Sequence, residues 1–165
     1  LQYYCIYGLE KRGMDIMEKE KSRELLREWI RILSDTENVY TVFIKRFHLS
    51  KNTFFALDYL NSYGEGEEPA ILAERLGLTR QMMTIVLNDL EKRGYIVRQG
   101  CTDDHRRKTI LLSKEGKAFA EKVCQASENF DLAALAGFSD EEFNVMLDLS
   151  RRFYERIKKQ LENKC

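Results

Sequence analysis

The chain has 165 residues, of which 44% are hydrophobic and 33% are charged, and its formal net charge at pH 7 is zero. This size and balance are typical of one folded domain and exclude an intrinsically disordered chain. The longest apolar runs, such as VYTVFI at 39–44, are far too short to cross a bilayer, and no charged segment followed by an apolar one opens the chain, so we expect a cytoplasmic protein.

The first predicted element is a long helix over residues 18–47. Residues 1–13 carry no helical stripe, and we interpret them as a non-native or disordered extension of a single domain that covers residues 14–165. In the helix, apolar side chains recur at spacings of three and four residues, with charged residues between them. Such a stripe needs a partner to cover it. Its members are Leu26, Trp29, Ile30, Leu33, Tyr40, Phe43 and Phe47.

Two shorter helices are expected next. Ser50 has the chemistry of an N-cap for a helix that ends at Gly64. That helix carries Phe54, Leu57, Asp58, Tyr59 and Leu60. Pro69 fits the first turn of a following helix of about two turns, because its missing N–H costs nothing there, and Gly77 ends this helix. The expected buried side of the second short helix consists of Ile71, Leu72, Ala73 and Leu76.

A fourth helix is predicted from Arg80 to Arg93, with Thr79 as its N-cap and Gly94 at its end. A short helix, a turn with glycine and a longer helix predict a helix-turn-helix, in which the small Ala73 permits close approach of the helices. The apolar stripe of the longer helix is Met83, Val86, Leu87 and Leu90. Its outward face then carries Arg80, Gln81, Thr84, Ile85 and Asn88. Such groups can read base edges in a major groove, although any surface helix also has polar residues outside.

A β-hairpin should follow, with short β-branched and apolar strands at 95–98 (YIVR) and 109–112 (TILL). A hairpin directly after a helix-turn-helix predicts a winged helix. Its tip is basic and is expected to reach a minor groove or a phosphate edge, whereas Asp104 would hold a neighbouring arginine. The basic residues of the tip are Arg106, Arg107 and Lys108.

Charge is unevenly distributed along the chain. Residues 79–117 hold nine Lys/Arg and five Asp/Glu, a net charge of +4, whereas residues 50–78 hold two Lys/Arg and five Asp/Glu, a net charge of −3. The longer helix of the helix-turn-helix and the wing are therefore the positive part of a neutral protein. This distribution favours a nucleic-acid partner.

Helical periodicity returns from Lys114 onward. Ser139 and Glu142 form the sequence pattern of a capping box, which predicts the start of the last helix. The first of these C-terminal helices has one face formed by Phe119, Ala120, Val123, Ser127 and Phe130. The last helix has a long stripe formed by Phe143, Met146, Leu147, Ser150, Phe153, Tyr154, Ile157 and Leu161. The predicted fold class is mainly α with a small β-hairpin wing.

The run AILAERLGLTRQMMTIVLNDLEKRGYIVRQGCTDDHRRKTILLSKEG, residues 70–116, resembles the winged-helix core of the MarR family of bacterial transcriptional regulators. The most diagnostic parts are LEKRGYIVR at 90–98, the wing signature Asp104-His105-Arg106, and Leu112-Ser113 followed by Gly116, where the family has Leu-Thr followed by Gly. The number and length of the flanking helices agree as well. The resemblance therefore covers about residues 18–163.

The resemblance implies an obligate homodimer on a pseudo-palindromic operator in double-stranded DNA. Helices at about 18–47 and 114–163 would form the dimerisation region, and residues 50–113 the winged-helix lobe. Ile85 stands where the family often has a basic residue, so the operator sequence should differ at that contact. The candidate DNA-binding residues are Thr79, Arg80, Gln81, Met82, Thr84, Ile85, Asn88, Arg98, Asp104, Arg106, Arg107 and Lys108. The function that we expect is transcriptional repression released by a small-molecule effector.

Members of this family respond to small aromatic or anionic ligands bound between the dimer region and the DNA lobe, and some respond to thiol oxidation or to metal. The candidate ligand lining in this chain is an aromatic-rich joint between the first two helices, and most of its residues also fit a plain core. It consists of Tyr40, Phe43, Phe47, His48, Phe54, Phe55 and Tyr59.

The cysteines at 5, 101, 124 and 165 form no CxxC pair, and there are only two histidines, so no disulfide framework, zinc site or cofactor is indicated. Cys101 is the candidate redox thiol, because basic neighbours such as Arg98 and Arg106 favour the thiolate. Cys124, beside Val123 on a helix, is predicted to be packed.

Three other functions compete with that of an effector-released repressor. An enzyme is disfavoured because the sequence has no phosphate loop, no pairing of carboxylate with histidine and no nucleophile elbow. The alternatives closer to the family are a redox-responsive regulator acting through Cys101 and a winged-helix module for protein contact. In the last case the +4 segment should not be accessible as one surface.

Overall fold

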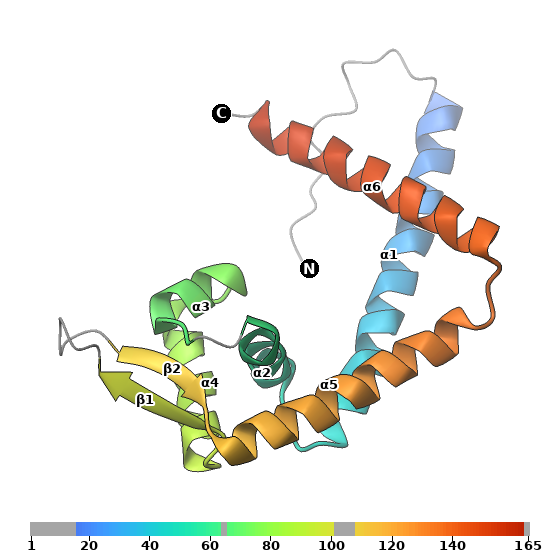
Figure 1. Ribbon diagram of the computed structural model, residues 1–165. Helices are drawn as coiled ribbons and strands as arrows, with labels where there is room; N and C mark the ends of the chain where they lie inside the picture. Colours follow the sequence, from blue (N-terminus) through green and yellow to red (C-terminus); the bar gives the residue numbers. More distant parts are fainter. Residues whose placement is uncertain (1–15, 64–65, 101–107, 164–165) are drawn as a thin grey trace. The chain divides into compact units, whose positions relative to one another are not determined.

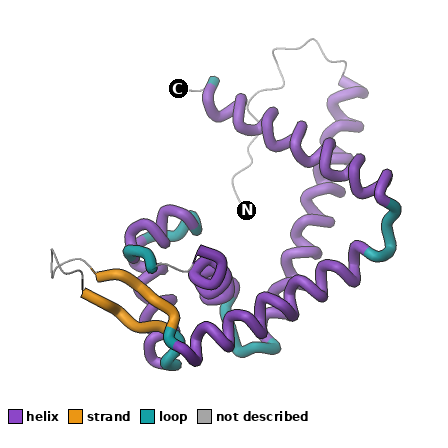
Figure 2. The backbone as a smooth tube through the Cα atoms, viewed as in Figure 1, coloured by secondary structure: helices purple, strands orange, loops and turns teal. Residues whose placement is uncertain are grey.

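The computed structural model describes residues 16–63, 66–100 and 108–163, and the chain forms two compact units, residues 1–54 and 55–165. The described residues form helices and one small sheet (Figures 1 and 2). The fold is mainly α with a small β-hairpin, as the sequence predicts. The elements in chain order are α1 (Ile16–Lys45), α2 (Lys51–Tyr63), α3 (Pro69–Arg75), α4 (Arg80–Lys92), β1 (Ile96–Gly100), β2 (Lys108–Leu112), α5 (Lys114–Leu135) and α6 (Asp140–Glu162).

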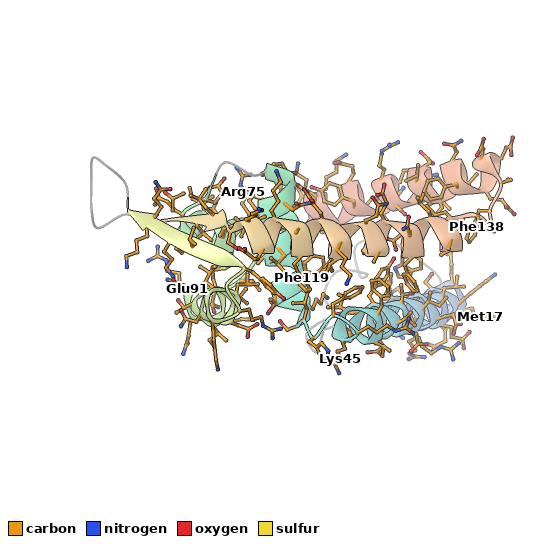
Figure 3. The ribbon with its side chains drawn as sticks, turned by 60° about the horizontal axis from the view of Figure 1, so that its bottom comes forward. Met17, Lys45, Arg75, Glu91, Phe119 and Phe138 are labelled. Atoms are coloured by element: carbon orange, nitrogen blue, oxygen red, sulfur yellow. The ribbon has the colours of Figure 1, made fainter. Side chains whose placement is uncertain are left out.

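The first unit contains α1, a helix of 30 residues that runs from near Met17 to Lys45 (Figure 3). Most of its side chains are exposed, whereas Phe43 and Ile44 near its C-terminal end are buried. The helix ends at Lys45, two residues before the predicted end. His48 then adopts a φ of 57°, a left-handed conformation that terminates helices. Large apolar side chains are exposed on α1 at Leu25, Leu26, Trp29, Ile30, Ile32, Leu33 and Val39.

The predicted cap of α2 is confirmed. The Ser50 hydroxyl accepts a hydrogen bond from the backbone N–H of Thr53, with 3.1 Å between N and Oγ. This bond satisfies one of the N–H groups that the first helical turn leaves without an intrahelical partner. Side-chain chemistry at a single position therefore fixes where α2 begins.

The core of the second unit lies where α3 packs on α4 and both helices contact the hairpin (Figure 1). The predicted stripe of α4 is buried, whereas the predicted burial of Ile71 on α3 is wrong, since this side chain is 37% exposed. Ile71 and Leu72 are consecutive and point about 100° apart around the helix, so a two-turn helix that buries Leu72 turns Ile71 outward. The core residues are Ala56, Leu57, Leu60, Leu72, Ala73, Met83, Val86, Leu87, Leu90, Ile96, Ile110, Ala120 and Val123.

The hairpin strands β1 and β2 are antiparallel, with Arg98 opposite Ile110. β1 begins one residue and ends two residues later than predicted, whereas β2 begins one residue earlier, at Lys108, and ends at Leu112 as predicted. A short segment before α3 adds to this sheet. The Glu67 N–H donates to the Ile110 carbonyl at 3.2 Å, and the Ile110 N–H donates to the Glu67 carbonyl at 2.8 Å.

The base of the hairpin joins α5 at a close backbone contact. The Ser113 hydroxyl accepts from the Gly116 N–H at 2.9 Å, which caps α5, and it also contacts the Gly94 carbonyl at 2.6 Å. Gly116 is buried against the backbone of Tyr95, where a Cβ would overlap the Tyr95 carbonyl oxygen. The ring of Phe119 stacks on that of Tyr95, with 4.4 Å between centroids. These contacts set the direction in which the hairpin leaves the helix.

The capping box that begins α6 is confirmed. The Glu142 N–H donates to the Ser139 hydroxyl at 3.2 Å, and the Ser139 N–H donates to the Glu142 carboxylate at 2.9 Å. None of the residues of α6, Asp140–Glu162, is buried. Its exposed apolar side chains include Val145, Met146, Leu147, Leu149, Phe153, Tyr154, Ile157 and Leu161.

No helix in the described ranges is both long enough and apolar enough to span a membrane.

Candidate nucleic-acid interface

The candidate interface is built on α4, whose start is fixed by Thr79. The Thr79 hydroxyl accepts a hydrogen bond from the Met82 N–H at 3.2 Å, as the sequence predicts for an N-cap. Because the apolar stripe of α4 is buried, the opposite face of this helix is turned to solvent. The predicted outward residues are all exposed: Arg80, Gln81, Thr84, Ile85 and Asn88. Met82 is exposed as well.

The turn that precedes α4 has the geometry of a helix-turn-helix. Gly77 has a φ of 63°, which a side chain would strain, and the Leu78 N–H donates to the Ala73 carbonyl at 2.8 Å. Ala73 is buried between the helices. These contacts hold α3 and α4 together and leave the N-terminal half of α4 accessible.

Ile85 is the most exposed large apolar residue of α4, at 65%, and it lies between polar residues on the outward face. An isoleucine side chain that stays in water contributes no burial of apolar surface to the stability of the fold. In a major groove it would meet the C5-methyl group of thymine, which is the apolar feature of base edges. The outward face therefore offers both hydrogen-bonding and apolar contacts.

Arg98 on β1 reaches back to α4. Its Nε lies 3.0 Å from Glu91 Oε2, and its Nη2 lies 2.7 Å from Asn88 Oδ1. Figure 3 shows Glu91 on α4. Two of the predicted DNA-binding residues, Arg98 and Asn88, are thus brought together. Glu91 was missed by sequence reasoning, because periodicity places it on the same side of the helix as Asn88 but does not reveal a partner on the following strand.

Most of the predicted wing tip falls outside the described residues. Asp104, Arg106 and Arg107 belong to that part, as does Cys101, and their predicted roles remain predictions. Lys108, at the start of β2, is exposed.

The residues of the candidate ligand lining are divided between the two units. In the first unit, Phe43 and Phe54 are buried, and the rings of Phe43 and Phe47 meet edge to face with 5.5 Å between centroids. His48 and Tyr40 of the first unit are exposed, and so is Phe55, which begins the second unit. In the second unit, the Tyr59 hydroxyl donates to the Glu67 carboxylate at 3.4 Å. Phe43 and Phe54 thus have the burial of core residues.

Cys124 is half-buried on α5, in agreement with its predicted packing. Burial raises the pKa of its thiol to about 12, and the hydrogen bond to Asp58 and the negative charge of that carboxylate act in the same direction. Among the side chains that the structure describes, no three His, Cys, Asp or Glu residues come together as a metal site requires.

Comparison with known proteins places this geometry in a family. The family model described as "MarR family" matches residues 49–107. An HTH-type transcriptional regulator of Bacillus cereus is 30% identical over 122 residues, which cover 72% of this chain and 80% of that protein. The chain belongs to the MarR family of transcriptional regulators. The resemblance seen in the sequence is thereby confirmed, and the homologues of this MarR-family chain are regulators and not enzymes.

Two further matches to the MarR-family chain cover different shares of its length. The transcriptional repressor YetL of Bacillus subtilis is 30% identical over 89 residues, and the match spans about half of each protein, 54% of this chain and 53% of YetL. The solved structure of Streptococcus pneumoniae FabT in complex with DNA has a TM-score of 0.71 at 21% identity and covers 84% of this chain and 98% of FabT. This structural similarity confirms the winged-helix fold.

Proposed function

We propose that this MarR-family chain is a cytoplasmic homodimer that binds a pseudo-palindromic operator in double-stranded DNA and represses transcription until a small effector releases it. The observation that carries the proposal is the outward face of α4, a capped helix that exposes Arg80, Gln81, Thr84, Ile85 and Asn88 and is followed along the chain by the hairpin strands β1 and β2. The repressor activity of YetL and the DNA complex of FabT support it by analogy.

The N-terminal half of α4 would enter the major groove, as the second helix of a helix-turn-helix does. Gln81 can bond the N6 and N7 positions of adenine together, and Ile85 can contact a thymine methyl group. Arg80, in the first turn, would contact a phosphate. The positive charge of residues 79–117 would attract the DNA backbone.

A second copy of the chain would cover the apolar stripes at both ends. A monomer rarely exposes contiguous apolar surface of this extent, and α1 and α6 each expose large apolar side chains along most of their length. A two-fold dimer would also place two α4 helices on two half-sites of one operator. The same pairing would explain why the capping box starts a helix that buries none of its residues within its own chain.

The effector would be a small aromatic or anionic molecule near the aromatic joint that includes Tyr40, Phe47 and His48. The alternative input is oxidation of Cys101. A Cys101→Ser variant distinguishes the two, because peroxide would then no longer change DNA binding by a redox regulator. If peroxide still changes DNA binding by the Cys101→Ser variant, oxidation of Cys101 is excluded as the regulatory input.

Binding of the purified protein to the DNA upstream of its own gene, against a scrambled fragment at several salt concentrations, tests the proposal. Specific binding with two subunits per site and a steep loss of affinity as salt rises is expected. Binding that is weak and equal on both DNAs would contradict it and would favour a role in protein contact.

A further inference from the structure

The observation behind this inference is the pair of bonds that Arg98 makes to α4. Arg98 lies on β1, its Nη2 donates to Asn88 Oδ1 at 2.7 Å and its Nε donates to Glu91 Oε2 at 3.0 Å. The side chain of Arg98 is only 23% exposed, whereas that of Glu91 is 45% exposed. A single guanidinium thus ties the wing strand to two positions one turn apart on the helix.

The chemistry of arginine fixes which way the Asn88 amide points. A guanidinium has only donors, so the atom that faces it must be the amide oxygen of Asn88. The Nδ2 group, with its two protons, is then the part of Asn88 directed away from Arg98. An unrestrained asparagine reads adenine by using its oxygen and its nitrogen together. Asn88 has its oxygen already engaged by a charged donor.

The positive charge of Arg98 is compensated by the carboxylate of Glu91 on α4. Glu91 lies within ion-pair distance of the guanidinium. A phosphate oxygen approaching Arg98 would have to displace this carboxylate or accept its repulsion. Arg98, which the sequence indicates only as a candidate DNA-binding residue, is therefore poorly suited to contact a phosphate directly.

Resting on the proposed function, we propose that Arg98 is a positioning residue for base readout: it orients the Asn88 amide so that Asn88 meets DNA as a hydrogen-bond donor. Asn88 then selects a base edge that accepts hydrogen bonds, such as the O6 and N7 of guanine or the O4 of thymine. Releasing the amide should shift the preference at that base pair toward adenine.

The experiment uses the full-length protein and operator variants that differ at the one base pair whose readout Asn88→Ala abolishes. Arg98→Met should change the preference at this base pair by roughly tenfold, the size expected of one good base contact. The salt slope of binding should stay unchanged, because no phosphate contact is lost. In the Asn88→Ala background, Arg98→Met should have no further effect on preference.

Arg93→Met is the matched control, since it removes another arginine that is paired with a carboxylate of α4, Asp89, at 2.9 Å. It should leave the base preference as it is. If Arg98→Met fails to fold, Arg98→Lys replaces it, because lysine keeps the charge but lacks the fork that spans Asn88 and Glu91. The lysine variant should lose the preference in the same way.

The possible outcomes separate this inference from the proposed function. If Arg98→Met weakens binding to all sequences alike and lowers the salt slope by about one, Arg98 is a phosphate contact and the inference is overturned. Retained preference in Arg98→Lys, or an effect of Arg98→Met that persists without Asn88, would overturn it too. Sequence-blind binding by the unchanged protein would instead remove the proposed function, and this inference with it.

Discussion

The thiol of Cys124 on α5 donates a hydrogen bond to the carboxylate of Asp58 on α2, with 3.3 Å between Sγ and Oδ1. This bond crosses 66 positions of sequence and joins the helix after the wing to a helix before it. Burial and the neighbouring carboxylate both disfavour the thiolate. Cys124 is consequently a structural residue, in contrast to a cysteine that a redox sensor would use.

The raised pKa of Cys124 predicts slow alkylation. The thiolate is the reactive form, so a chain in which Cys124 is the single remaining cysteine should react with iodoacetamide with a pH midpoint near 12, against 9.0 for an ordinary thiol. Asp58→Asn removes the negative charge and should lower the midpoint and raise the rate at pH 8. A rate in the folded protein equal to that in urea would contradict this account.

Substitution of Gly116 by alanine should destabilise the second unit. The added Cβ would overlap the Tyr95 carbonyl oxygen, and the cost should be about 2 kcal/mol, because backbone on both sides must shift. This loss should exceed the gain in helix propensity, about 1 kcal/mol, from replacing a helical glycine. Gly100→Ala is the control, since no atom lies within 4 Å of its added Cβ. Equal urea midpoints for the two variants would rule out the close contact.

Charge introduced into the apolar stripe of α6 should separate the proposed dimer. Ile157→Glu places a carboxylate among exposed apolar side chains, and burying it unpaired would cost more than the contact gains. Lys159→Glu, about 200° away around the helix, should leave the dimer intact. Truncation after Glu155 should act like Ile157→Glu. Sedimentation of Ile157→Glu as a folded dimer would show that α6 lies outside the interface.

Arg106 and Gln81 should respond differently to substitution by alanine. In the proposed complex the wing that carries Arg106 reaches a minor groove or a phosphate edge, so Arg106→Ala should weaken binding to every sequence and reduce the salt slope by about one. Loss of Gln81 should cost about 1–3 kcal/mol of discrimination at one base pair and leave the slope unchanged. Titrations of operator variants at several salt concentrations measure both quantities. If Gln81→Ala changes affinity without changing base preference, Gln81 contacts a phosphate instead.

Local chemistry made much of the fold predictable. Ser50, Thr79 and Ser139 act as caps because a side-chain oxygen three residues before a free N–H is a short-range interaction that the sequence displays directly. The buried stripe of α4 follows from its periodicity in the same way. The seven residues of α3 make only about two turns, too few for apolar periodicity to define one buried face. The predicted burial of Ile71 is wrong for this reason.

The contacts that complete the site were not predictable from the sequence. Arg98 finds Glu91 and Asn88 only because the turn after α4 folds β1 back along the helix, and the sequence does not specify that approach. The pairing of Cys124 with Asp58 depends on how α2 and α5 pack. Each of these contacts joins residues from different elements, so each requires the tertiary structure before its chemistry can be recognised.

The backbone pairing of Glu67 with Ile110 limits how the chain can change in length. Glu67 pairs with Ile110 of β2 in a single antiparallel bridge, and Pro69, two residues later, begins α3. One inserted residue between them would rotate α3 by about 100° about its axis, which would turn Leu72 out of the core while the sheet kept its register. Insertions and deletions between Glu67 and Pro69 should therefore be rare among chains that share this architecture, even though the segment is a loop.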